Sequence, residues 1–488
     1  MARRTEGLPR LVRMENDTDR PRKARRNPKV DEARSLLEHR HSTVEFLWCK
    51  EESLDKTVGG RRSGRPPPSS WSKNRFSAPG FGVLFRYLPV AFTRRCAKNV
   101  HPDRLRGRML KNLTSFEMDS LAQSYNLTDG HAFRRWFAAE EAIIDRSPQL
   151  FKNNNRRMQA EIERHYVRDF SRLAGQTCDE GALGYLMCFT ASMAFEVIAN
   201  YLRLHRLSLA LIEPCFDNLA DIFHRHYTPL RPIPDALLEA PGDTFERVLS
   251  DIQSDAICLV TPNNPTGMTL SEGNLRSLRH FCKAHKKLLI LDNCFRAYLP
   301  RNRVYDQYRL VSEAGVDAVL IEDTWKTWPT SEIKAPFFAV SRSGGLFERI
   351  YEIYTDFLLH VSPVGIKLMH EFIRLSQRDD FASIHDVVRV NRRALYDNLA
   401  GTFLTPCEHP FASVSWLRID HSLSGLELKQ ALDEYGVFVL PGNHFFWHDR
   451  RKGEKFIRVA LARDTDMFRE AATLLGEVCR KVADTVPI

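Results

Sequence analysis

A lysine, an aspartate and an asparagine each follow a short apolar run that predicts a buried strand. The amine of Lys326 can form a Schiff base with an aldehyde, and the carboxylate of Asp292 can keep a ring nitrogen protonated. Asn264, in the turn sequence Thr-Pro-Asn-Asn-Pro-Thr-Gly, can donate a hydrogen bond to a ring oxygen. Because ligands of open α/β sheets bind at the carboxyl ends of strands, we expect these side chains to face one ligand.

Two further segments offer partners for a phosphate and for a flat ring. Thr190, Ala191 and Ser192 stand between a predicted strand and a predicted helix, so their hydroxyls and free amides can bind phosphate at the positive end of the helix dipole. Phe216, in Glu-Pro-Cys-Phe, can stack on an aromatic face. An aldehyde, a ring nitrogen, a flat ring and a phosphate together make up pyridoxal 5′-phosphate (PLP), which we predict as the cofactor.

Each residue also has an ordinary interpretation when it is taken alone. A lysine after a strand usually lies on the surface, and Asp292 or Thr190 can simply cap a helix. A phenylalanine after a strand is usually part of the core. The joint occurrence of these residues, in this order along the chain, favours the cofactor site.

The elements that must position these residues alternate between helices and short apolar strands. A helix is predicted over 159–174 and strands over 186–189, 207–212, 256–260, 287–291 and 318–321. This pattern predicts an α/β fold with a mainly parallel sheet between layers of helices. After about residue 365 the sequence predicts a long helix, strands near 413–417 and 456–460, and a closing helix.

Four segments follow from this pattern. We predict a basic extension over 1–108, an N-terminal active-site segment over 109–155, a large PLP-binding domain over 156–360 and a small C-terminal domain over 361–488. The extension holds 26 of the 71 Lys and Arg residues but 12 of the 61 acidic residues, so the rest of the chain is slightly acidic. We expect most of it to be disordered, with one predicted helix over 30–58, and a misassigned start codon upstream of Met109 would account for it.

Composition excludes several classes of protein. No apolar run reaches the roughly eighteen residues of a membrane span, and the N-terminus is charged where a signal peptide would be apolar, so we expect a soluble cytoplasmic protein. The ten cysteines are scattered without a C-x-x-C pair, which predicts free thiols and no structural zinc or other metal site.

Over about 110–488 these residues resemble PLP-dependent enzymes of fold type I, the aspartate aminotransferase superfamily (class I/II). The resemblance implies that Lys326 carries the cofactor and that Asp292, Asn264 and Phe216 hold its ring. It also implies a homodimer, and it assigns the substrate α-carboxylate to Arg458, in Phe-Ile-Arg-Val-Ala, whose planar fork suits a carboxylate.

The chain departs from the superfamily pattern at two positions. Lys334 stands where a phosphate-binding arginine is expected, which keeps the charge but loses the fork. Phe295 stands where a tyrosine is usual, which removes one hydrogen bond to the cofactor's ring oxygen. The protonation behaviour of the cofactor is therefore expected to differ from that of a standard aminotransferase.

A finer resemblance concerns the segment ahead of the fold. Thr114 and Glu117 in Thr-x-x-Glu, Asp129 and His131 in Asp-x-His, and Asp323 three residues before the lysine match the spacing of PLP-dependent, oxygen-using L-arginine oxidases and hydroxylases. The resemblance implies that these residues surround a guanidino amino acid, with Glu117 and Asp323 as carboxylates for the guanidinium and His131 as a base or as the residue that positions a water. The first motif is also a helix capping box, and the second can be an ordinary turn.

The resemblance implies an enzyme that binds an arginine-like amino acid and O2 and yields a 2-oxo or 4-hydroxy-2-oxo acid for specialised metabolism. A conventional class I/II aminotransferase and an enzyme similar to capreomycidine synthase remain alternatives on the same fold. A third alternative is a transcription regulator that joins a DNA-binding winged helix to a PLP-binding domain. Residues 1–108 lack the successive amphipathic helices of a DNA-binding winged-helix domain, so a nucleic-acid partner is not expected.

Overall fold

The computed structural model describes residues 111–152, 158–407, 409 and 411–485. Predictions made for 1–108, including the helix over 30–58, lie outside these residues. Among the described helices, none combines the length and the apolar composition that a membrane span requires.

A seven-stranded sheet forms the larger part of the core, with strand order β2-β8-β7-β6-β5-β3-β4. Its strands are β2 (Leu183–Met187), β3 (Leu209–Glu213), β4 (Leu230–Pro234), β5 (Ala256–Val260), β6 (Leu288–Asp292), β7 (Ala318–Glu322) and β8 (Phe337–Ser341). All neighbours pair in parallel except β8, which is antiparallel to both β7 and β2. The prediction of a mainly parallel α/β sheet is confirmed.

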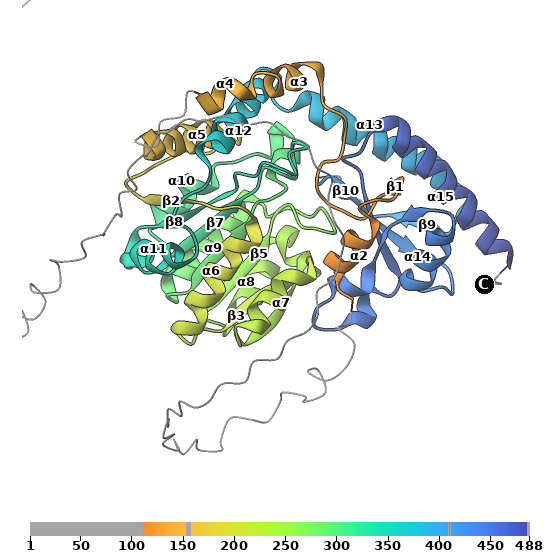
Figure 1. Cartoon of the computed structure of the whole chain (residues 1–488). Coiled ribbons are helices and arrows are strands. Elements are labelled where there is room, and N and C mark those ends of the chain that lie inside the picture. The colour runs from red at the N-terminus through yellow and green to blue at the C-terminus, as the bar shows by residue number, and fades with distance from the viewer. Residues whose placement is uncertain (1–110, 153–157, 408, 410, 486–488) are drawn as a thin grey trace, which may run out of the picture. The chain divides into compact units, whose positions relative to one another are not determined.

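The five strands β3, β5, β6, β7 and β8 are buried at every position, because helices cover the sheet. Figure 1 shows these helices around the yellow and green strands. The helices of this part are α5 (Gln159–Leu173), α6 (Ala191–Leu204), α7 (Asp217–Arg225), α8 (Gly242–Ser250), α9 (Glu272–Ala284), α10 (Gln307–Ala314) and α11 (Leu346–Phe357).

Strand β2 begins three residues earlier than the strand predicted over 186–189. The sequence Leu-Gly-Tyr-Leu-Met contains Gly184, which weakens a strand prediction. In the fold, the ring of Phe347 fills the space where a side chain at Gly184 would lie. The glycine is therefore required by packing between β2 and α11.

The C-terminal part contains a four-stranded antiparallel sheet in the order β12-β13-β10-β9. Its strands are β9 (Leu404–Pro406), β10 (Val414–Ile419), β12 (Leu440–Pro441) and β13 (Phe456–Ala460), and its helices are α12 (Pro363–Ser376), α13 (Ala382–Leu399), α14 (Gly425–Glu434) and α15 (Thr465–Thr485). The sequence predicted a long helix after about residue 365, and the structure contains two helices there, α12 and α13, of which α13 has 18 residues. Asp380 and Phe381 adopt left-handed backbone angles (φ 55° and 63°) and separate α12 from α13.

The N-terminal segment contains α2 (Leu113–Ser120), β1 (Tyr125–Asn126), α3 (Ala138–Ile144) and α4 (Ser147–Lys152). Strand β1 pairs in parallel with β11 (Val437–Phe438). Helix α2 contacts α7 and β12, and Figure 1 shows it in orange between the green and blue parts of the chain. Its Leu113 and Phe116 form a small apolar cluster with Trp416, Leu440 and Phe445.

Candidate active site

A cavity of about 210 Å³, which we call the site cavity, lies at the carboxyl ends of β5, β6 and β7. Thirteen of the fourteen predicted site residues line it: Thr114, Glu117, His131, Thr190, Ala191, Ser192, Phe216, Asn264, Asp292, Asp323, Lys326, Lys334 and Arg458. The remaining one, Asp129, contacts the His131 ring. The fold therefore brings together segments up to about 340 residues apart.

Three neighbouring strands deliver the central residues. Asp292 is the last residue of β6, while Asn264 and Lys326 each stand four residues after the end of β5 and β7. Because these strands are adjacent and parallel, the segments after them meet at one edge of the sheet. This explains why the apolar runs in the sequence were sufficient to predict the juxtaposition.

Asp292 is buried, and its Oδ1 accepts a hydrogen bond from the backbone N–H of Cys294 at 3.0 Å. Burial raises the pKa of Asp292 above its ordinary value. Within the described part of the chain, no cationic side chain forms an ion pair with it. A protonated pyridine nitrogen would supply the missing positive charge, so Asp292 fits that cofactor atom.

Arg458 lies in β13 with no exposed surface. Its Nη1 donates to Asn264 Oδ1 at 3.2 Å, which leaves the Asn264 amide nitrogen to donate to a ring oxygen. Its Nη2 lies 3.3 Å from Glu117 Oε1, and its Nε has no hydrogen-bond partner among the described residues. Burial lowers the pKa of Arg458, but a guanidinium still remains charged near neutral pH.

One end of the site cavity is the N-terminus of α6, a helix of 14 residues. Thr190 caps this helix by accepting the N–H of Met193 at 3.1 Å, and Asn218 donates to the Ser192 hydroxyl at 3.1 Å. The first amides of the helix face the same end of the cavity and have no partner within the helix. These hydroxyls and amides, together with the helix dipole, fit a phosphate group, and we call them the phosphate cradle.

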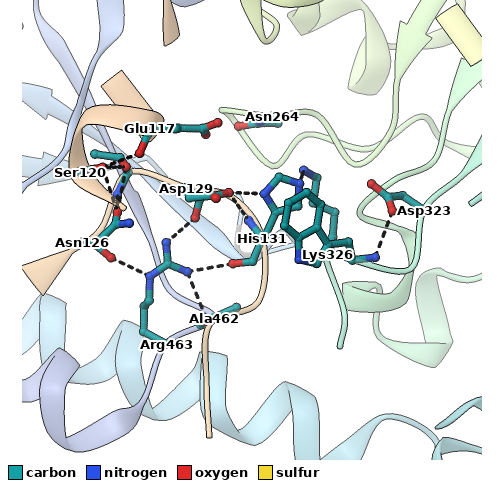
Figure 2. Close-up of polar contacts among 12 residues, drawn as sticks. Glu117, Ser120, Asn126, Asp129, His131, Asn264, Asp323, Lys326, Ala462 and Arg463 are labelled. Carbon is teal, nitrogen blue, oxygen red and sulfur yellow. Dashed lines mark hydrogen bonds and ion pairs between the residues drawn. The ribbon is translucent and has the colours of Figure 1, made fainter. Parts of the chain in front are cut away.

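His131, in the N-terminal segment, contacts the side chain of Lys326 directly. Its Nε2 lies 2.8 Å from Lys326 Nζ, and its Nδ1 bonds to the Asp129 carboxylate (Figure 2). Burial, followed by the charge of Lys326, lowers the pKa of His131 to about 4, so the ring is neutral near pH 7. Burial opposes ionisation of Asp129, but His131, Lys326 and Arg463 outweigh it and lower the Asp129 pKa. An ionised Asp129 therefore accepts from Nδ1–H, which leaves the Nε2 lone pair facing Lys326.

Trp325 was not predicted from the sequence, although it precedes Lys326. Its indole stacks on the His131 ring at 3.5 Å between centroids, and the Lys334 ammonium lies 3.2 Å from an indole ring centre. Two groups this close to one ring would overlap on the same face, so they lie on opposite faces. The indole therefore separates the histidine from a cation. No feature of the sequence pattern indicated this stack.

Arg463 was also missed, although a charge within the apolar sequence Val-Ala-Leu-Ala-Arg could have indicated a buried role. It is 1% exposed and donates to the carbonyls of Asn126 (2.7 Å), His131 (2.8 Å), Ala462 (3.2 Å) and Asp129. Figure 2 shows its guanidinium inside the curve of the Asp129-to-His131 loop. It fixes the backbone that carries the histidine.

Helix α2 does not use the capping box suggested by Thr114 and Glu117. Its N-cap is Asn112, which forms the box with Ser115, so Thr114 and Glu117 are left to face the site cavity. Burial, and then the charge of Asp129, raise the pKa of Glu117 to about 7.

A neighbouring aspartate anchors the start of this helix. Asp217 Oδ2 accepts the N–H of Leu113 at 2.9 Å. Burial raises the pKa of Asp217 to about 7. The anchor joins α2 to the first residue of α7, which directly follows Phe216.

The remaining predicted residues complete the lining of the site cavity. Phe216 is half-buried at the start of α7, and Phe295 adds an aromatic edge without a hydroxyl. Asp323 is 8% exposed, and its Oδ1 accepts the N–H of Trp325 at 3.0 Å. Asp323 and Glu117 therefore place two carboxyl groups in one cavity with Lys326.

Comparison with known proteins agrees with this arrangement. Residues 208–322 match the family described as aminotransferase class I and II. The structure of MppP soaked with its product 2-ketoarginine is 30% identical in sequence, with a TM-score of 0.65 and coverage of 72% of this chain and 98% of MppP. The chain belongs to the PLP-dependent enzymes of fold type I, among the class I and II aminotransferases and MppP.

Other relatives support the fold. Aspartate aminotransferase from Thermus thermophilus, solved with maleate, has a TM-score of 0.63 at 14% identity, with 78% of this chain and 100% of that chain covered. The LL-diaminopimelate aminotransferase of Gloeobacter violaceus is 29% identical over 257 residues, which are 50% of this chain. The matched region spans 60% of that aminotransferase's length.

The cofactor is PLP, and the described residues fit each of its groups. When PLP is bound, Lys326 would hold its aldehyde, Asp292 would pair with its ring nitrogen, and Asn264 would donate to its ring oxygen. The α6 N-terminus and Lys334 offer hydroxyls, amides and a positive charge for the phosphate. Burial lowers the pKa of Lys334 from its ordinary value.

Proposed function

We propose that this enzyme is an oxygen-using oxidase of L-arginine or a related guanidino amino acid, and that it releases a 2-oxo acid. The observation that carries the proposal is the charge pattern of the site cavity. Buried Arg458 suits an α-carboxylate, while Glu117 and Asp323 line the same cavity and suit a guanidinium. The similarity to MppP, whose structure was determined with the product 2-ketoarginine, supports the same class of substrate.

When bound, PLP supplies an electron sink for the electron pair left by removal of the α-proton. Lys326 is placed to remove that proton once the substrate amine has taken its position on the cofactor. His131 is neutral, and its Nε2 lies 2.8 Å from Nζ, so it can accept a proton from Lys326 or from a water beside the substrate. Asp129 and Trp325 hold the ring in this orientation.

The overall reaction balances as amino acid plus O2 and water giving 2-oxo acid, ammonia and hydrogen peroxide. Transfer of two further electrons and two protons from the side chain to a second O2, with release of a second hydrogen peroxide and addition of one more water, would give the 4-hydroxy-2-oxo acid. In an aminotransferase, by contrast, the amino group remains on the cofactor and passes to a second 2-oxo acid.

The test uses the PLP-loaded enzyme with L-arginine, in air and under argon. Oxygen uptake, peroxide formation and a 2-oxo product identified by mass spectrometry are the expected results. Turnover under argon that requires an added 2-oxo acid would refute the oxidase and establish an aminotransferase. A cyclised guanidino product without oxygen uptake would identify a capreomycidine-type enzyme.

We also propose that the enzyme is a homodimer. A second hollow of about 570 Å³ is lined by apolar residues that include Phe151 and Phe189, which are 67% and 46% exposed. Phe189 directly precedes the phosphate cradle at Thr190, so a second copy covering this hollow would lie near the site cavity. Light scattering of the purified enzyme tests this, and a monomer at micromolar concentration would refute it.

A further inference from the structure

The guanidinium of Arg458 is already held by a carboxylate from α2. Glu117 Oε1 lies 3.3 Å from Nη2 of Arg458. The Arg458 side chain has no exposed surface. Asn264 accepts from Nη1 at 3.2 Å, and Nε has no hydrogen-bond partner among the described residues. Figure 2 shows the Glu117 carboxylate turned toward Asn264. Glu117 therefore occupies part of the Arg458 guanidinium that the substrate α-carboxylate needs for a bidentate contact.

Glu117 and a substrate carboxylate would compete for the guanidinium of Arg458. Glu117 is 9% exposed, and Asp129 lies close enough to add a repulsive charge. A third carboxylate in this buried space would leave more negative charge than Arg458 can compensate. Entry of the substrate carboxylate therefore favours departure of Glu117 from Arg458.

We propose that Glu117 is a specificity-determining residue that exchanges partners: it neutralises Arg458 in the free enzyme and moves to the substrate's side-chain cation when the α-carboxylate takes its place. This inference rests on the proposed function and deepens it. A cationic amino acid breaks one ion pair and forms two. An amino acid with an uncharged side chain breaks one pair and forms one, which leaves Glu117 buried without a cation.

The exchange requires a movement of the side chain and not of α2. The helix is anchored at its start by the bond from Leu113 N–H to Asp217. Phe116, on the preceding position, is buried in the cluster with Trp416 and Phe445. The helix therefore keeps its place while the Glu117 carboxylate turns within the site cavity.

The experiment measures amino-acid binding to the PLP-loaded enzyme through the cofactor absorbance, under argon so that oxidation does not interfere. The ligands are L-arginine and L-norleucine, and the enzymes are wild type, Glu117→Gln and Asp119→Asn. Asp119 is a matched carboxylate on α2 whose side chain is 57% exposed and pairs with Lys111 outside the site cavity.

Wild type is expected to bind arginine on the order of 100-fold more tightly than norleucine, because the wrong ligand leaves a buried charge unpaired. In Glu117→Gln, norleucine should bind more tightly than it does to wild type, since its carboxylate no longer competes for Arg458. Arginine should bind more weakly to the same variant. Asp119→Asn should behave as wild type.

Norleucine affinity that is unchanged or weaker in Glu117→Gln would overturn the exchange, because the exchange requires that loss of the Glu117 carboxylate frees Arg458 for the carboxylate of the ligand. Glu117→Ala repeats the test should the glutamine variant fail to fold. Equal affinity of wild type for both amino acids would overturn both the exchange and the substrate class. A successful exchange without oxygen uptake in air would instead overturn only the oxidase reaction.

Discussion

The preference for arginine over norleucine should depend on pH through Glu117. The pKa of Glu117 is raised to about 7 by burial and by Asp129, and only its ionised form can pair with a guanidinium. At pH 8 about nine tenths of the side chains are ionised, and at pH 6 about one tenth. The ratio of the two binding constants should therefore fall at least tenfold from pH 8 to pH 6, about tenfold from weaker arginine binding alone, and the loss is on the acidic side of the pKa.

The assay is the same absorbance titration at several pH values, and the ratio cancels the ionisation of the α-amino group that the two ligands share. Glu117→Gln should flatten the profile. Asp217, whose pKa is also about 7, titrates in this range while it holds α2, so Asp217→Asn is the control and should keep the slope. A constant ratio in wild type, or an equal slope in Glu117→Gln, would refute the assignment of this titration to Glu117.

Three further perturbations test the surroundings of the site. Trp325→Ala removes the stack on His131 and should lower kcat by roughly two- to twelvefold, while Trp325→Phe restores most of it; unchanged steady-state kinetics in the alanine variant would contradict this role. Lys334→Ala should weaken PLP retention by about 10- to 100-fold, measured by absorbance after dialysis, and Lys334→Arg should retain PLP at least as well as wild type; equal retention by the alanine variant would exclude a phosphate contact. Arg463→Lys should lower the free energy of unfolding in urea by about 2 to 4 kcal/mol, because a lysine cannot reach all four carbonyls, and an unchanged midpoint and slope would count against the clamp.

The sequence was sufficient for the part of the site that depends on strand ends. Asp292, Asn264 and Lys326 follow continuous apolar runs, and such runs become adjacent parallel strands whose carboxyl ends meet. The strands over 256–260 and 456–460 were predicted at their observed bounds. Chain periodicity and the order of motifs therefore place these residues without knowledge of tertiary contacts.

The parts that could not be predicted depend on contacts between distant segments. The stack of Trp325 on His131 joins positions about 190 residues apart. The hydrogen bond from Arg463 to the carbonyl of His131 joins positions more than 330 residues apart. Gly184 weakened the prediction of β2 because its requirement comes from Phe347, on another element. Sequence periodicity reports which face of an element is buried, but not which residue covers it.

The pairing of β1 with β11 ties the segment that carries His131 to the C-terminal part of the chain. Arg463, just after β13, strengthens that tie, whereas the lysine that His131 meets follows a strand of the large sheet. The two groups of the proposed proton relay, His131 and Lys326, therefore belong to different parts of the chain. A displacement of the C-terminal part away from the seven-stranded sheet would carry His131 off Lys326, so the proposed relay requires the arrangement in which these two side chains are in contact.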